Sequence, residues 1–304
     1  SPDVAKSNAV GVAEVKGTTA TIKLLDGILT LEGKTTYSEA AAAKLNGCLV
    51  TVSSYKRDYL TLSKVNGKGA STALNLTTNR MGTKELSAGA RFFEQVSNGR
   101  LVEIDRSDIT ITSIPANKIT YVGYDWAGRV DKLVLNDVTG DCYDYGMIYY
   151  RAAGYEESKD DGSEGSYQNG EIRVTNGSHT DGVSYVVGSV DGAKTNRMGG
   201  VAGSLDQLDG KNRMAAFMPL NEATGIRRAQ FDTDAMLLTT NSMVIPISDK
   251  VECYNKTTGD WFKPGEDGDH KAALNLALAF SDDITVYYDR SPEEGGKVRI
   301  VVVE

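Results

Sequence analysis

Short hydrophobic runs alternate with polar residues along most of the chain, and glycine-containing turns separate the runs. In residues 109–114, for example, isoleucine alternates with threonine and serine. Alternation of this kind places the apolar side chains on one face of a β-strand. Pro115 follows the run and ends it, since proline cannot donate to a strand's hydrogen-bond ladder. The pattern predicts an all-β protein with many tight turns.

A strand–turn–strand pattern occurs twice, at residues 118–138 and at residues 284–303. In the first copy, two runs rich in strand-forming residues flank a turn that contains Trp126 and Gly128. In the second copy, two similar runs flank a turn that contains Gly295. Each segment predicts a β-hairpin, and the recurrence indicates that a structural unit is repeated.

Three further short sequences recur in the same order as the hairpins, each roughly 160 residues after its first occurrence. They are Leu45-Asn46-Gly47 with Leu208-Asp209-Gly210, Leu76-Thr77-Thr78-Asn79 with Leu238-Thr239-Thr240-Asn241, and Asn98-Gly99 with Thr258-Gly259. At the start of each copy, Val10-Gly11-Val12 corresponds to Tyr145-Gly146-Met147. Ordered matches at a nearly constant spacing rarely arise by chance. We therefore predict two tandem copies, residues 1–144 and residues 145–304, each of ordinary domain size.

Each copy contains one short helical segment. Residues 38–45 include four consecutive alanines, with Ser38 as a cap and Gly47 as a stop. Residues 270–280 are the second helix candidate and come just before the final hairpin. The second copy also carries an acidic insertion near residues 156–169, whose composition predicts a flexible loop. The predicted fold is all-β, with two tandem copies of a small β-barrel or β-sandwich unit, each with one short helix.

The 304 residues carry a formal net charge of −8 and contain no cluster of lysine and arginine. Binding to nucleic acid and attachment to anionic membranes both need concentrated positive charge, so neither partner is expected. No apolar run approaches the roughly 20 residues needed to cross a bilayer, so we expect no membrane span.

Catalytic residue types are few and scattered. The two histidines, His179 and His270, cannot supply a multi-histidine zinc site, and no Cys-x-x-Cys pair occurs. The three cysteines are too widely spaced to indicate a disulfide framework. Neither a Gly-x-Ser-x-Gly motif nor a phosphate-binding loop occurs. We therefore expect no enzymatic activity and no cofactor, apart from a calcium alternative.

Asp137, Asp141 and Asp144 form a cluster of carboxylates. Carboxylates coordinate calcium, but the Asp-x-Asp-x-Asp-Gly spacing of the familiar calcium loop is missing. The other interpretations are solvated turn carboxylates and the acid–base pair of a glycosidase. All three interpretations stay open at the level of sequence.

Aromatic residues are concentrated between residues 121 and 155. Tyr121, Tyr124 and Trp126 are candidate ligand-binding residues, because exposed flat rings form the platforms of carbohydrate-binding proteins. The competing interpretation is that strand tyrosines fill the core and pair across strands. Trp126 fits this competing interpretation least, because the side chain of a residue in a turn has little hydrophobic core to pack against.

The closing sequence, residues 282–302, resembles the large extracellular proteins of gut Firmicutes that carry S-layer homology modules. Residues 133–141 resemble the same proteins. The resemblance is to their β-rich repeat region outside the anchoring modules, and we identify no S-layer homology module in these residues. It implies an extracellular, cell-surface location, a structural or adhesive role, and cell-envelope components or glycans as partners. We expect the signal and the anchor to lie outside this sequence.

These observations lead to three functional hypotheses. The first is a non-catalytic structural or adhesive module of a bacterial cell-surface protein that is associated with the S-layer. The second is a carbohydrate-binding module of an extracellular protein. The third is a cell-wall glycan hydrolase.

Overall fold

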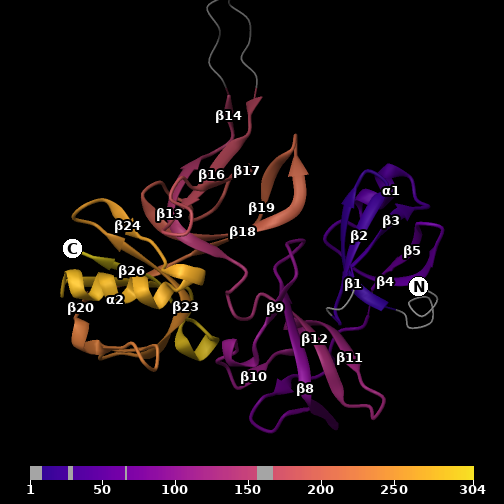
Figure 1. Ribbon diagram of the computed structural model, residues 1–304, viewed down its shortest axis with the longest axis horizontal. Coiled ribbons are helices and arrows are strands. Elements are labelled where there is room, and N and C mark those ends of the chain that lie inside the picture. The colour runs from indigo at the N-terminus through magenta and orange to yellow at the C-terminus, as the bar shows by residue number, and fades with distance from the viewer. Residues whose placement is uncertain (1–8, 27–29, 66, 156–166) are drawn as a thin grey trace, which may run out of the picture. The chain divides into compact units, whose positions relative to one another are not determined.

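The computed structural model describes residues 9–26, 30–65, 67–155 and 167–304 (Figure 1). The chain divides into two compact units, of which unit 1 comprises residues 1–138 and 204–207 and unit 2 comprises residues 139–203 and 208–304. Each unit contains a closed five-stranded barrel and a seven-stranded sheet. The predicted all-β fold of small barrel units is therefore confirmed. Among the residues described, no helix combines the length and apolar character that crossing a bilayer requires.

Five strands form the barrel of unit 1, in the order β1-β2-β3-β5-β4. They are β1 (Ala9–Lys16), β2 (Thr19–Leu24), β3 (Thr30–Thr35), β4 (Leu49–Lys56) and β5 (Tyr59–Lys64). Alternate side chains, such as Ile22, Val50 and Leu62, fill the interior. The short helix α1 (Glu39–Ala43) precedes β4, and the Ser38 hydroxyl caps it by accepting a hydrogen bond from the Ala41 N–H at 3.2 Å.

Seven strands form the sheet of unit 1, six in the order β10-β6-β7-β8-β12-β11 and β9 paired to β8. They are β6 (Leu74–Asn75), β7 (Arg80–Met81), β8 (Lys84–Gln95), β9 (Val102–Ile104), β10 (Ser113–Ile114), β11 (Ile119–Tyr124) and β12 (Val130–Asn136). The predicted hairpin is β11 and β12, and it joins the sheet through parallel pairing of β12 with β8. Phe92, Leu133 and Leu135 are buried in the core beneath it.

The barrel of unit 2 has the order β13-β16-β17-β19-β18. Its strands are β13 (Asp144–Arg151), β16 (Gly170–Thr175), β17 (Val183–Val187), β18 (Arg197–Leu208) and β19 (Lys211–Pro219). A separate two-stranded ribbon, β14 (Gly154–Tyr155) and β15 (Tyr167–Gln168), lies between β13 and β16 in the sequence. The rest of the predicted acidic insertion, residues 156–166, lies outside the described residues.

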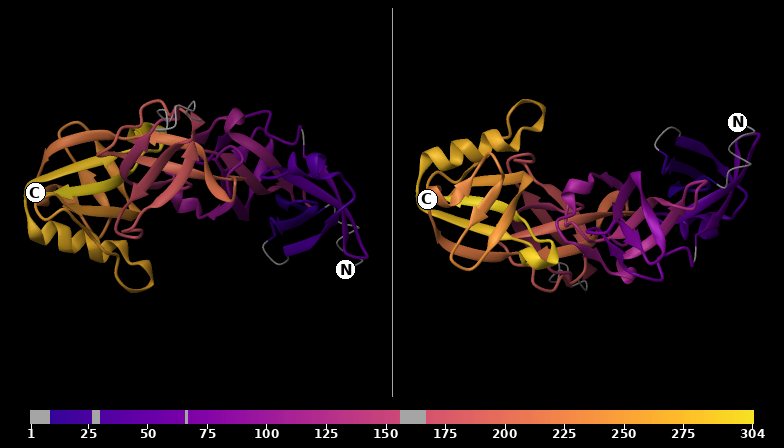
Figure 2. Two further views of the ribbon diagram at one scale, coloured as in Figure 1. Left: turned by 90° about the horizontal axis from the view of Figure 1, so that it is seen from above. Right: turned by 90° about the horizontal axis from the view of Figure 1, so that it is seen from below.

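The sheet of unit 2 has the order β20-β25-β26-β23-β22-β21, with β24 paired to β23. Its strands are β20 (Asn221–Ile226), β21 (Phe231–Asp232), β22 (Leu237–Thr239), β23 (Val244–Asn255), β24 (Asp260–Phe262), β25 (Ile284–Tyr288) and β26 (Val298–Val303). Helix α2 (His270–Phe280) lies along one face of this sheet (Figure 2), and it buries Leu274 and Leu278 in the core. The N–H of Ala272 donates to the Asp269 side chain at 3.1 Å, which caps the helix.

The two barrels share one strand order, and in the sheets the path β6-β7-β8-β12-β11 of unit 1 corresponds to β21-β22-β23-β26-β25 of unit 2. The remaining edge strand differs, because β10 pairs with β6 in unit 1 whereas β20 pairs with β25, at the opposite edge, in unit 2. In unit 1 Val130 of β12 pairs with Leu86 of β8, and in unit 2 Val298 of β26 pairs with Ile247 of β23. Both hairpins also have an irregular register close to the turn. The two hairpins therefore occupy the same structural surroundings, as a duplicated unit requires.

One close approach of two backbones also occurs in both barrels. A Cβ atom on Gly11 would lie 2.3 Å from the carbonyl oxygen of Lys23, and one on Gly146 would lie 2.3 Å from that of Thr175. Only glycine fits such a contact without a shift of the backbone. The correspondence between Val10-Gly11-Val12 and Tyr145-Gly146-Met147 is therefore confirmed.

Two of the recurring short sequences are not equivalent in the structure. Gly47 lies before β4, whereas Leu208-Asp209-Gly210 joins β18 to β19. The equivalent of Gly47 is Asn196, because both have positive φ and both donate a backbone hydrogen bond of 2.8 Å to the first strand of their barrel. Residues 76–79 join β6 to β7, whereas Thr239 lies in β22. Turns use the same few residue types, so short matches arise without structural equivalence.

The division between the units falls after Val138, whereas the sequence pattern predicts a boundary after residue 144. Residues 139–144 belong with unit 2, because Arg299 donates to the carbonyl oxygen of Thr139 at 2.6 Å and to Asp141 at 2.8 Å. The two helices also differ in position. Helix α1 accompanies a barrel, whereas α2 covers a sheet.

Substitution Gly146→Ala is expected to lower the free energy of unfolding of unit 2 by about 1–3 kcal/mol, because the new methyl group meets the carbonyl oxygen of Thr175. Gly188→Ala is the matched control, since nothing lies within 4 Å of a Cβ atom at Gly188. Urea unfolding followed by circular dichroism measures both. Equal stability of the two variants would contradict the assignment of Gly146.

Candidate functional site

The predicted carbohydrate platform is only partly assembled. Trp126 is 95% exposed and Tyr124 is 52% exposed, whereas Tyr121 is partly buried. Tyr121 and Tyr124 line one cavity of about 280 Å³, together with Asp131 and Lys132. The irregular register at Gly123 and Tyr124 explains why both tyrosines reach this cavity, since residues three apart on a regular strand face opposite sides. Trp126 is not part of the lining.

The three predicted carboxylates have different surroundings. Asp141 forms salt bridges with Arg299 at 2.8 Å and Lys297 at 3.2 Å. Asp144 accepts a hydrogen bond from the Asn176 side chain at 2.8 Å, and burial raises its pKa. Asp137 ends the first hairpin with a φ of 50°. In the part of the chain that the structure describes, no group of three or more histidine, cysteine or acidic side chains could hold a metal ion. A calcium site stays a prediction that these contacts do not favour.

A larger cavity of about 620 Å³ lies in unit 2, lined by β13, β16 and the hairpin of β23 and β24. We call it the aromatic groove and define it by Tyr149, Arg173, Tyr254, Asp260, Trp261 and Lys263. Its volume is within the range of small-molecule sites. The sequence prediction included Tyr149 among the clustered aromatic residues but missed Tyr254 and Trp261. The signal that could have found Trp261 is its position directly after the predicted turn at Gly259.

The rings of the groove are held by local structure. Tyr254 pairs with Trp261 across β23 and β24, and their ring centroids lie 4.9 Å apart at an interplanar angle of 47°. The neighbours of Tyr254 along β23, Cys253 and Asn255, are buried, so strand alternation turns the Tyr254 ring outwards. Arg173 of β16 pairs with Tyr149 of β13, and its guanidinium lies 4.6 Å from the ring centroid of Tyr149.

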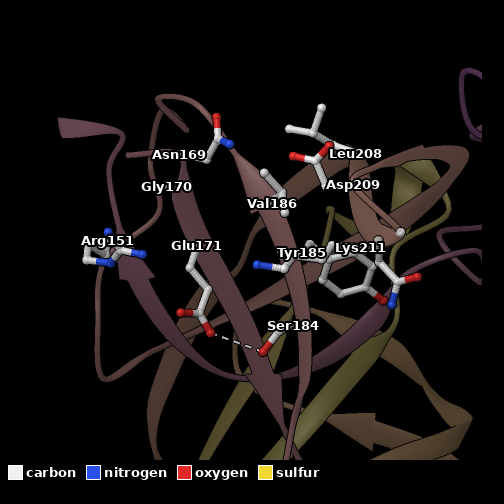
Figure 3. Close-up of a pocket in the computed structure, with 12 residues that line it drawn as sticks. Arg151, Asn169, Gly170, Glu171, Ser184, Tyr185, Val186, Leu208, Asp209 and Lys211 are labelled. Carbon is white, nitrogen blue, oxygen red and sulfur yellow. Dashed lines mark hydrogen bonds between the residues drawn. The ribbon is translucent and has the colours of Figure 1, made fainter. Parts of the chain in front are cut away.

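A second cavity of unit 2, of about 470 Å³, lies beside β16, β17 and the turn from β18 to β19 (Figure 3). Arg151 lies on one side of it and Lys211 on the other, with Glu171 and Tyr185 between them. Glu171 accepts a hydrogen bond from the Ser184 hydroxyl at 3.1 Å. This cavity offers balanced charges and one aromatic ring, whereas the groove offers three rings.

Comparisons with protein-family models, with curated proteins and with solved structures find no match to this chain.

A buried ionic cluster joins the barrel of unit 2 to its sheet. Arg299 of β26 is 3% exposed, and its guanidinium contacts Asp289 at 3.0 Å in addition to Asp141. The guanidinium also lies 4.8 Å from the ring centroid of Tyr145 in β13. Lys297 and Arg299 interrupt a sequence that is otherwise rich in valine and isoleucine, and this interruption was the available sequence signal.

Glu252 of β23 is buried against the loop that follows β16. Its carboxylate accepts hydrogen bonds from the Ser178 hydroxyl at 2.6 Å and from the Gly177 N–H at 3.0 Å. The Nδ1 atom of His270 lies 3.8 Å from Glu252 Oε1. Burial raises the pKa of Glu252 to about 7, and the nearby Asp144 acts in the same direction. Neither Glu252 nor His270 lines any of the three cavities above, so this contact holds a loop in place.

Asp289→Asn is expected to destabilise unit 2 by about 3–5 kcal/mol, because it leaves the buried Arg299 guanidinium with one carboxylate fewer. Glu304→Gln is the matched control, since its ion pair with Lys256 is exposed and such pairs contribute less than about 1 kcal/mol. Urea unfolding measures both variants. If Asp289→Asn lowers the free energy of unfolding no more than Glu304→Gln does, the buried cluster does not stabilise unit 2.

The raised pKa of Glu252 predicts how the free energy of unfolding depends on pH. Its pKa is about 7 in the folded protein and 4.5 ordinarily, so the folded state binds more protons between these values. The free energy of unfolding should therefore fall as pH rises from 4.5 through 7. Glu252→Gln removes this contribution, so the variant should match the original protein at pH 4 and exceed its stability by up to about 3 kcal/mol at pH 8.

The measurement is urea unfolding at several pH values. Glu293→Gln serves as the control, because Glu293 is exposed. If Glu252→Gln and Glu293→Gln show the same pH profile, the burial of an ionised Glu252 carboxylate does not limit stability.

Proposed function

We propose that the chain is a non-catalytic structural or adhesive module of a bacterial cell-surface protein that is associated with the S-layer. The sequence resemblance of residues 282–302 and 133–141 supports this location. The duplicated architecture supports the role, because closed barrels leave few unpaired strand edges, which suits a protein exposed to a variable exterior.

The observation that carries the proposal is the buried ionic cluster of unit 2. Arg299 on β26 contacts Asp289 beyond β25 and also Thr139 and Asp141, which precede β13. Separation of the barrel from the sheet would break the ion pairs and hydrogen bonds of this cluster together, so the cluster links the two parts into one body. Resistance of this kind fits a spacer or an adhesive module.

The purified chain, coupled to beads, is expected to retain cell-envelope fragments of a Gram-positive bacterium or to sediment as assemblies of its own. A parallel screen against glycoside, peptide and ester substrates is expected to show no turnover. Turnover that disappears in Glu252→Gln would overturn the proposal in favour of a hydrolase, because burial raises the pKa of Glu252 to about 7, where a carboxyl group can act as a general acid or base. Absence of both retention and assembly would also count against the proposal.

A second candidate function is carbohydrate binding, and the aromatic groove favours it. Tyr254 and Trp261 present a tilted pair of partly exposed rings beside polar side chains. Ring faces that stand in a polar cavity suit the apolar faces of sugar rings, while the polar groups bind hydroxyls. The exposed Trp126 hairpin of unit 1 is the alternative platform.

Binding to a glycan array is expected to disappear in Trp261→Ala and to persist in Trp126→Ala. Circular dichroism of both variants controls for folding. The reverse result would place the platform on the hairpin of unit 1, and an array without any binding would remove carbohydrate binding as a function.

A further inference from the structure

The charge of the aromatic groove differs from that of the whole chain. Its lining contains two cations, Arg173 and Lys263, and one carboxylate, Asp260. The chain as a whole has a net charge of −8. Glu171 forms an ion pair with Arg173 at 3.5 Å, so Lys263 supplies most of the attraction that the groove exerts on an anion.

The two cations stand in different settings. The Arg173 guanidinium lies over the Tyr149 ring, 4.6 Å from its centroid, and has a Glu171 carboxylate oxygen 3.5 Å from its Nη1 atom, so its position is set by two contacts. Stacking orders a guanidinium while its edge stays available for a planar acid. Lys263 follows β24 directly, and its side chain is exposed beside Trp261.

Each side of the groove supplies at least one ring and one cation, since Lys263 lies on the same side as Trp261. Tyr254 and Trp261 belong to the hairpin of β23 and β24, whereas Tyr149 and Arg173 belong to the barrel. The loop from β16 that lies between them is held to β23 by the hydrogen bonds of Ser178 and Gly177 with Glu252. The two sides are therefore fixed in relation to each other within unit 2, which lowers the entropic cost of binding.

We propose that the aromatic groove binds a saccharide that bears an anionic group, with a sugar ring against Tyr254 and Trp261 and the anion at Lys263 and Arg173. The inference rests on the carbohydrate-binding function proposed above and specifies its ligand class. A carboxylate and a phosphate satisfy the same chemistry, because both offer negatively charged oxygen acceptors to these two cations. A pair of aromatic rings without a nearby cation would bind neutral and anionic sugars equally well.

The test uses the full chain and a panel of oligosaccharides in matched pairs. Uronate-bearing oligosaccharides are paired with their methyl esters, and phosphorylated oligosaccharides with their unphosphorylated forms. Isothermal titration calorimetry at 0.15 M salt is expected to show at least tenfold tighter binding for the anionic member of one pair or more. The preference should shrink as salt increases, since exposed charges are screened.

Three variants separate the contributions. Trp261→Ala should abolish binding of both members of a pair. Lys263→Gln should weaken binding of the anionic member about fivefold and leave the neutral member unchanged. Lys250→Gln is the matched control, because Lys250 is exposed on β23 and lies outside the groove lining, and it should change neither. Circular dichroism and urea unfolding confirm that each variant folds.

The outcomes distinguish carbohydrate binding in general from the preference for an anionic saccharide. Equal affinity for both members of every pair overturns the inference and leaves carbohydrate binding intact. No binding to any saccharide overturns both. Tighter binding of poly-glutamate than of any anionic saccharide, with the same loss in Lys263→Gln, identifies an acidic peptide as the ligand and also overturns the inference.

Discussion

The ion pairs of Arg299 link the sheet of unit 2 to the segment that begins its barrel. A guanidinium that is 3% exposed must have its charge and its donors satisfied, since burial of an unpaired ion costs several kcal/mol. Arg299 and Lys297 supply two positive charges, and Asp141 and Asp289 supply two negative ones. The cluster is balanced only when β26 lies against the segment that begins the barrel. The position of the barrel relative to the sheet within unit 2 follows from this requirement.

Much of the fold follows from the sequence pattern. Alternation and turns predict the all-β class, and the two hairpins are recognisable because each combines strand-forming runs with a glycine in the turn. Gly11 and Gly146 are equivalent because a side chain is excluded there on physical grounds. Gly47 and Gly210 are not equivalent although their short sequences match. Both glycine and asparagine adopt positive φ, and Asn196 occupies the position equivalent to Gly47. The two copies therefore share the backbone conformation at these positions even where the residue type differs.

The candidate site was less accessible to sequence reasoning. Composition indicates aromatic residues in abundance, yet it does not show that Tyr149 and Trp261, more than a hundred residues apart, line one cavity. Trp126, the tryptophan that the sequence pattern singles out, is 95% exposed and lines none of the three cavities. The surroundings of Glu252 were equally hidden, because its raised pKa arises from burial by a distant loop. Properties that depend on contacts between remote segments emerge only with the tertiary structure.

Tandem copies of one topology face the hazard that a strand pairs with the wrong copy. The closing strands β12 and β26 would be interchangeable by shape, since Val130 and Val298 make equivalent parallel pairings. The next residue differs, because Asp131 follows Val130 in β12 and Arg299 follows Val298 in β26. Insertion of β26 into unit 1 would take Arg299 away from Asp141, and insertion of β12 into unit 2 would place Asp131 near Asp141. The opposite charges at this one position therefore suit each strand to its own unit and disfavour an exchange of the two strands.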